Sequence, residues 1–453
     1  MTFMHFFPEF LIVMQLFAVL VLTGFGGLSR GIPALAVSIV STLGLLFFAS
    51  RTDLAFFDSP AAMIQSDSLA CFGRMLSLLM VSLFSLGAWF HPGMNVREKQ
   101  QSTVFILFLA FFICALFLSQ SLVLFSGAAI GIHFCVSNLI LIESKSSNSW
   151  LKILRAQSVT HALSWCLGIV FFTVSVSLFR GAFFSAWPGA LAGSTPGWEL
   201  EVFLVLLVLA GSLPLLPLRQ SGQAPYSLGI AAFGSLLVLQ VFWYRMGVPF
   251  LASSQVLPKM PARILLALLM GGITLRSVVS AIRSRDHDAW ISSILPVLTG
   301  VCLFSLLLPS EQSLPAFEKM ALALLLMIPL VSRVFLDREY RVKGFGVVAL
   351  FMILGTPPLV QGEQIYRMIK ELIDSHDLVA AALLGLIWYG LTLATIQFIG
   401  KVLLVRIPGE RLKRAGAGDW IFFAIFVVGI VSLTAFQGPL VSLLNEHPLL
   451  NLW

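Results

Sequence analysis

Charged side chains are scarce in this 453-residue sequence, where Asp, Glu, Lys and Arg together make up 11% of the residues. Apolar residues make up 58%, and the mean hydropathy is +0.96. Soluble domains carry about 25% charged residues, so this composition excludes that class of protein. It predicts an all-α polytopic protein that crosses the bilayer many times.

Cysteine is also rare, and no common catalytic motif is present. The Cys residues have neither close pairs nor metal-ligand spacing, which excludes a disulfide framework and a zinc site: Cys71, Cys114, Cys135, Cys166 and Cys302. The sequence contains no Walker loop, dinucleotide fingerprint, Ser-His-Asp arrangement or metal motif. We therefore expect no metal, no cofactor and no redox chemistry within this chain.

Apolar runs long enough to span a bilayer, roughly 17 to 25 residues each, predict about 14 transmembrane segments. The segment that follows MTFMHFFPEF is expected to remain in the mature protein, because this stretch has Glu9 and no Lys or Arg. The predicted spans are 8-27, 32-49, 70-90, 104-119, 120-142, 157-179, 200-218, 226-243, 264-283, 290-308, 319-335, 344-373, 378-402 and 420-437.

The distribution of Lys and Arg predicts the orientation of these segments. Connections after odd-numbered segments hold about 18 of them and connections after even-numbered segments, with their helix ends, about 9. This bias places the odd connections in the cytoplasm and both termini outside. The net charge of +7 is then a topology signal and gives no support to nucleic-acid binding.

Two segments are interrupted by Gly and Pro. Segment 7 contains Gly211 and Pro214, and segment 12 contains Gly355, Pro357 and Pro358. Because the two breaks are offset by five segments, segments 4-8 and 9-13 are interpreted as two five-helix repeats, the second inverted relative to the first. Ordinary proline kinks are the alternative, since Gly and Pro are frequent in membrane helices.

The repeat interpretation divides the chain into four parts. Residues 1-103 hold segments 1 to 3, residues 104-243 the first repeat, residues 244-402 the second repeat, and residues 403-453 the last segment. The longest polar connections are only about 15 to 20 residues, so no soluble domain is expected.

Four stretches stand in an order that points to one family. They are IQSDSLACFGRMLSLLMVSLF, LFSGAAIGIHFCVSNLILIESKSSNSWLKILRAQSVTHAL, LAGSLPLLPL and ALFMILGTPPLVQGEQIY. Together they resemble segments 3, 5 to 6, 7 and 12 of the N subunit of bacterial NADH-quinone oxidoreductase (respiratory complex I), with Asp67 and Lys152 on family positions. The resemblance covers nearly the whole chain.

The resemblance implies an antiporter-like subunit of the bacterial cytoplasmic (inner) membrane, whose partners are the other membrane-arm subunits. The family couples quinone reduction to proton movement through a Glu in segment 5 and Lys residues in segments 7, 8 and 12. Ionisable groups at such depths are costly and rarely present without function. Here the matching places hold apolar residues: Ala129, Leu209, Leu237 and Ile365.

A segment 10 that begins with a Lys-Arg pair and carries a His in the family also differs, with Asp288, Ala289 and Leu298 at those places. Every expected proton carrier within the membrane is therefore missing. A subunit released from pumping is stabilised by such replacements, because a lone Lys or Glu in hydrocarbon costs roughly 2.5 to 3.5 kcal/mol. The sequence predicts a degenerate proton channel in a retained fold.

Four remaining basic residues are candidates for a proton path. His133, in segment 5, is interpreted either as a substitute relay or as a packed side chain. His161 is expected at the cytoplasmic end of segment 6, and Lys152 in the loop before it. Arg276 either snorkels or pairs with another charge.

Three functions are open at this point. The first is a structural or weakly proton-conducting membrane-arm subunit of a complex I-like oxidoreductase. The second is an independent secondary transporter or a lipid-linked-saccharide membrane protein, and the third is a structural paralogue recruited to another assembly. The sequence does not say which assembly the chain joins, which ion it moves, or whether an intact paralogue exists.

Overall fold

The structure is a computed structural model. It describes residues 6-24, 32-49, 57-58, 65-91, 94-143, 225-247, 259-284, 287-308, 310-336, 360-403 and a few residues between 420 and 428. Nearly all of these residues are helical, as expected. Two short strands, β1 (Phe57–Asp58) and β2 (Gln65–Ser66), form an antiparallel pair.

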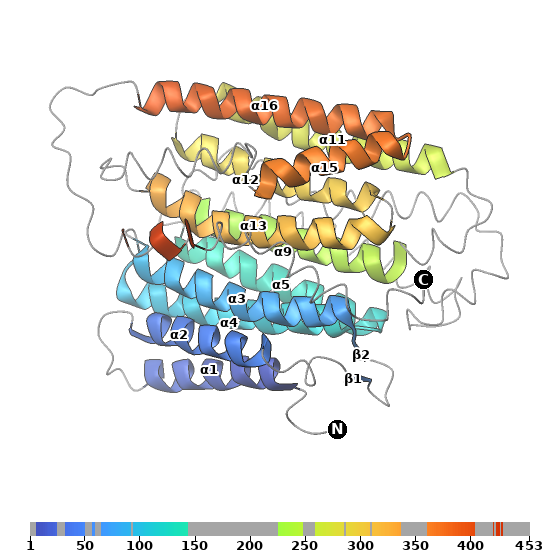
Figure 1. Ribbon diagram of the computed structural model, residues 1–453. Helices are drawn as coiled ribbons and strands as arrows, with labels where there is room; N and C mark the ends of the chain where they lie inside the picture. The colour runs from blue at the N-terminus through green and yellow to red at the C-terminus, as the bar shows by residue number, and fades with distance from the viewer. Residues whose placement is uncertain are drawn as a thin grey trace, which may run out of the picture. The chain divides into compact units, whose positions relative to one another are not determined.

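The chain divides into two compact units, Met1–Gly211 with Leu237–Lys259, and Ser212–Leu236 with Met260–Trp453. The helices of unit 1 are α1 (Phe7–Gly24), α2 (Ile32–Ala49), α3 (Ser68–Phe90), α4 (Val96–Leu118), α5 (Leu122–Glu143) and the π-helix η5 (Trp243–Gly247). Helix α3 packs against α2 and α4, and α4 also packs against α1 and α5 (Figure 1). In α3, 83% of an apolar 18-residue stretch is buried, compared with 44% in α5. Helix α3 therefore lies in the interior of this unit.

Local side-chain contacts set the ends of these helices. The Asp67 carboxylate accepts a hydrogen bond from the Ala70 N–H at 2.8 Å and caps α3. Asn95 and Glu98 form a reciprocal capping box that starts α4. Helices α4 and α5 are separate, as predicted, because the chain leaves the helix at Ser119, whose hydroxyl donates to the Leu116 carbonyl at 2.6 Å.

Unit 2 contains most of the second half of the chain. Its helices are α9 (Pro225–Phe242), whose last residues belong to unit 1, α11 (Lys259–Arg283), α12 (His287–Leu303), the 3-10 helix η6 (Phe304–Leu307), α13 (Ser310–Leu336), α15 (Val360–Asp374) and α16 (Leu378–Leu403). Helix α12 packs against α13 and α16, and α15 packs against the same two helices. The Trp290 ring stacks on Phe398 with a centroid distance of 4.1 Å and holds α12 on α16.

Helices α11 and α16 run in the same direction. A Cβ atom on Gly271 would lie 2.9 Å from Leu383 Cδ1, and one on Gly390 would lie 2.5 Å from Val278 Cγ1. The second contact lies further along the chain than the first in both helices, so α11 and α16 are parallel. The predicted segments 9 and 13 agree with this, because both are odd-numbered.

Five described helices are long and apolar enough to cross a membrane: Leu69–Phe90, Val96–Leu118, Val123–Glu143, Leu266–Arg283 and Leu378–Phe398. The protein is therefore a multi-pass helical membrane protein. The total of about 14 segments, the inverted repeats and the four-part division stay predictions. The break residues Gly211, Pro214, Gly355, Pro357 and Pro358 lie outside the described residues.

Candidate functional site

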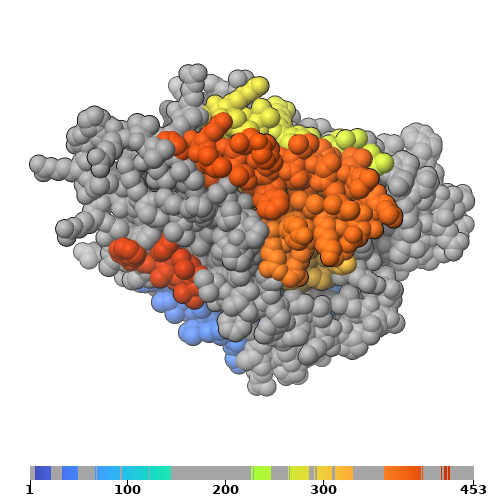
Figure 2. Space-filling model, turned by 45° about the horizontal axis from the view of Figure 1, so that its top comes forward, coloured from blue at the N-terminus to red at the C-terminus, as the bar shows by residue number. Residues whose placement is uncertain are grey.

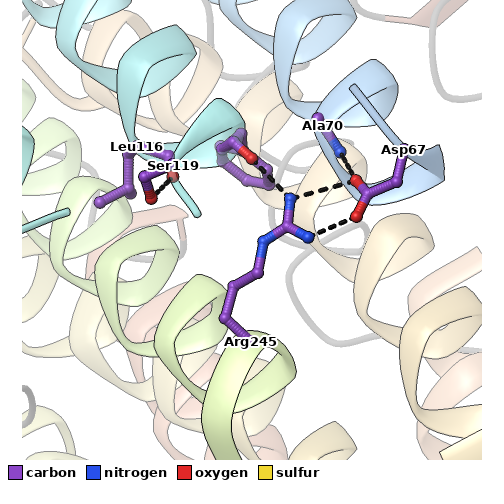
Figure 3. Close-up of polar contacts among 6 residues, drawn as sticks. Asp67, Ala70, Leu116, Ser119 and Arg245 are labelled. Atoms are coloured by element: carbon purple, nitrogen blue, oxygen red, sulfur yellow. Dashed lines mark hydrogen bonds and ion pairs between the residues drawn. The ribbon is translucent and has the colours of Figure 1, made fainter. Parts of the chain in front are cut away.

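An ion pair within unit 1 fixes the start of α3. The Arg245 guanidinium, on η5, donates to both carboxylate oxygens of Asp67, with Nη2 at 3.1 Å from Oδ1 (Figure 3). The same Nη2 donates to the Phe117 carbonyl of α4 at 2.9 Å. Because Asp67 also caps α3, one carboxylate joins α3 to η5 and, through Arg245, to α4.

A second ion pair lies deeper in the same unit. Arg74, on α3, is fully buried, and its Nε and Nη2 atoms donate to the two Glu9 carboxylate oxygens of α1 at 2.7 and 3.1 Å. Its guanidinium carbon also lies 4.9 Å from the centre of the Phe48 ring of α2. Arg74 therefore links three helices through one side chain.

A third buried pair lies beyond the C-terminal end of α3. His91 Nε2 is 3.3 Å from Glu143 Oε1, at the last residue of α5, and both side chains are at most 7% exposed. The pair joins the ends of α3 and α5.

Hydroxyl and amide groups add neutral contacts between α1, α2 and α3. Ser41 Oγ donates to Gln15 Oε1 at 3.0 Å, and Thr42 Oγ1 lies 2.6 Å from Ser82 Oγ. Such contacts satisfy polar groups where water is absent and help to fix helix register.

Two of these three ion pairs are unsuited to proton transfer. Arginine stays charged in proteins, so the pairs of Arg74 and Arg245 cannot pass a proton through the guanidinium. A bidentate Arg-carboxylate pair instead fixes the distance and orientation of the helices that it joins.

No group of three metal-binding side chains occurs in the described part of the chain.

Unit 2 contains a buried acid that the sequence did not single out. Glu318 of α13 is 4% exposed, and Gln364 of α15 is 3% exposed, with no hydrogen-bond partner for its Nε2 atom in the described structure. The next residue, Lys319, interacts electrostatically with Glu318 and with Glu363. Helices α13 and α15 therefore meet at a polar patch just after the predicted break of segment 12.

The structure describes two of the four predicted proton-path residues. His133 is half-buried on α5, and its backbone carbonyl accepts a hydrogen bond from Ser137 Oγ at 2.8 Å. Arg276 is exposed on α11. The two lie in different units, and Lys152 and His161 lie outside the described residues.

The sequence analysis missed the ion-pair residues as a group. Arg74 and Arg245 entered the orientation count as charges of connections and helix ends, whereas Arg74 is buried within α3. A signal was present, because Glu9 and Arg74 both interrupt apolar runs and ionisable residues there are usually paired. The partner of each was not readable from the sequence, because it is 65 positions away.

Comparison by sequence leaves the family of this chain open. No protein-family model matches it, and no curated protein is significantly similar. Comparison by structure gives clear matches at low sequence identity.

A chain of the membrane-bound sulfane sulfur reductase, an archaeal respiratory membrane complex, superimposes with a TM-score of 0.75 at 13% identity, over 95% of this chain and 75% of that one. A chain of respiratory complex I from Thermus thermophilus with bound NADH gives a TM-score of 0.71 at 14% identity, over 96% and 95%. A second structure of that complex, with bound aureothin, gives 0.62 at 17% identity, over 95% and 96%. The chain therefore shares its fold with chains of two kinds of respiratory membrane complex.

Proposed function

We propose that this chain is a membrane-arm subunit of a complex I-like, proton-translocating oxidoreductase, with an antiporter-like fold, a degenerate proton channel and a mainly structural role. The shared fold over 96% of this chain and 95% of a complex I chain supports the assignment to such an assembly. The order of the four family-like stretches supports the N subunit as its nearest counterpart.

The degenerate channel rests on one observation: apolar side chains fill the described positions where the resemblance predicts proton carriers. Leu237, Leu298 and Ile365 are at most 4% exposed, and Ala129 is half-buried on α5. An alkyl side chain neither accepts nor donates a proton, so a chain of carriers is interrupted at each of these places. Burial of Leu or Ile in place of Lys also stabilises a membrane helix.

The ion pairs of unit 1 support the structural role. Each joins two or three helices through groups that are buried or partly buried, and two of the three contain an arginine. Such pairs are expected to hold the helices in one arrangement. Any residual proton path would use His133 with water, or the pair of His91 and Glu143.

The inverted repeat, the bacterial inner membrane and the outward termini belong to the same proposal. The parallel course of α11 and α16 supports the helix order on which the repeat depends. The Lys and Arg bias supports the orientation.

The test is the composition of the native assembly. An affinity tag on the full-length chain, solubilisation of native membranes in a mild detergent, and mass spectrometry should recover other antiporter-like subunits together with a quinone-reducing module. Recovery of the chain alone, or with a substrate of its own, would contradict the proposal and favour an independent transporter.

A further inference from the structure

One face of α11 is exposed from Leu268 to Arg283. Its exposed residues recur at helical spacing and form what we name the α11 stripe: Leu268, Gly272, Arg276, Val279 and Arg283. A Cβ atom on Gly272 would meet no atom within 4 Å, so this part of the stripe is open. The adjacent Gly271 instead contacts Leu383 of α16, so a different face of α11 packs within unit 2.

Arg276 lies well inside the apolar part of the helix. The candidate span runs from Leu266 to Arg283, and Arg276 lies ten residues from its start and seven from its end. At 1.5 Å per residue, Arg276 is therefore about 15 Å from one end and about 10 Å from the other. In Figure 2, α11 (yellow) and α16 (orange-red) both reach the surface. Apart from Arg276 and Arg283, the α11 stripe is therefore apolar, and it lies on a helix long enough to span a bilayer.

Two arginines elsewhere in the described apolar helices have partners. Arg74 pairs with Glu9, and Arg245 pairs with Asp67. Among the described residues, no hydrogen bond or ion pair reaches the Arg276 side chain. A charge at this depth is unfavourable in lipid unless an opposite charge or water compensates it.

We propose that the α11 stripe docks a transmembrane helix of a neighbouring subunit, and that this helix places an Asp or Glu carboxylate against Arg276. Charge complementarity selects the acidic side chain, because a guanidinium in hydrocarbon is best compensated by a carboxylate. Gly272, one turn earlier, allows the neighbouring backbone to come close, as small residues do in membrane helix pairs. The inference rests on the proposed membership of a membrane assembly and names the surface that this assembly uses.

A zero-length cross-link tests the carboxylate directly. In the variant Arg276→Lys, the charge is kept and the new amine can attack a carboxyl activated by a hydrophobic carbodiimide. An amide then forms and the urea leaves, whereas the wild-type guanidinium does not react in this way. In native membranes we expect mass spectrometry to find position 276 joined to an Asp or Glu in an apolar segment of another subunit.

Two further variants separate docking from exposure to lipid. If the stripe docks a helix, Arg276→Leu leaves the partner carboxylate unpaired and reduces co-purification of that subunit by about tenfold or more. If the stripe faces lipid, Arg276→Leu removes a charge from hydrocarbon, and the assembly is unchanged or more stable. Gly272→Leu should also weaken the assembly, whereas the matched change Gly127→Leu, at an exposed glycine of α5 with the same open space, should not.

Each outcome decides the inference. A cross-link to another subunit with loss of assembly in Arg276→Leu supports it. A cross-link to a carboxylate of this same chain, or an unchanged assembly in Arg276→Leu, overturns it. If the chain co-purifies with an oxidoreductase but Arg276→Leu has no effect, only this inference fails; if position 276 is linked to a subunit of another kind of assembly, only the proposed function fails.

Discussion

The Arg74 guanidinium and the Glu9 carboxylate face each other across the α1 and α3 helices in a bidentate pair, with N–O distances of 2.7 and 3.1 Å. Arg74 is fully buried and Glu9 is 13% exposed. Neither charge reaches bulk water easily, so each depends on the other for compensation. This pair is one of the described contacts that hold the first three helices together.

Removal of one member of this pair should destabilise the protein more than removal of both. We expect Arg74→Met or Glu9→Gln alone to lower the free energy of unfolding by about 3 to 5 kcal/mol, because the remaining group is left buried without its partner. The double variant Arg74→Met with Glu9→Leu should recover most of this loss. Denaturant titration of the detergent-solubilised chain measures the stability of the wild type, the single variants and the double variant. If the losses of the single variants simply add in the double variant, the prediction is wrong.

Two substitutions of Asp67, the partner of Arg245, should lower the stability of the protein by different amounts. Asp67→Asn keeps an oxygen that can cap α3 and loses the charge, whereas Asp67→Ala loses both. We expect the second variant to be less stable than the first by about 0.5 to 2 kcal/mol, the usual contribution of an N-cap. Thermal unfolding followed by circular dichroism compares the two, and equal stabilities would show that the cap contributes nothing here.

Two glycines of unit 1 should respond oppositely to alanine. A Cβ atom on Gly73 would lie 2.0 to 2.5 Å from the Phe117 side chain, whereas one on Gly127 would meet nothing within 4 Å. Gly73→Ala should cost about 1 to 3 kcal/mol through overpacking between α3 and α4. Gly127→Ala should be neutral or stabilising by up to about 1 kcal/mol, because alanine favours the helix. Thermal unfolding of both variants tests the pair, with each serving as the control for the other.

The proposed structural role predicts a small effect at His133. In His133→Ala, proton pumping by the intact assembly should stay close to the wild-type rate, because apolar residues occupy the positions where the resemblance places proton carriers. The measurement is acidification of proteoliposomes with a pH-sensitive dye, after native gels have shown that the assembly is complete. A large loss of pumping in a complete assembly would instead identify His133 as a relay.

Much of the helical framework was predictable from local sequence. Runs of apolar residues predicted the spans of α3, α5, α11 and α16, because each helix must be long and apolar enough to cross hydrocarbon. The end of α4 was predicted but not its start: the helix begins at Val96, eight residues before the predicted 104, because a capping box starts it among polar residues. The break between α4 and α5 at Ser119 was also predicted. The start of α13 was not: the helix begins at Ser310, nine residues before the predicted 319, because the buried Glu318 lies within the helix and does not end it.

The sequence by itself determined that the chain is a multi-pass helical membrane protein, since its composition and the length of its apolar runs carry this fact. Only the tertiary structure decided which charges compensate one another. Arg245 lies 178 positions from Asp67, and Arg74 lies 65 positions from Glu9. The packing of the helices brings these groups together, and no periodicity within one helix specifies a partner on another.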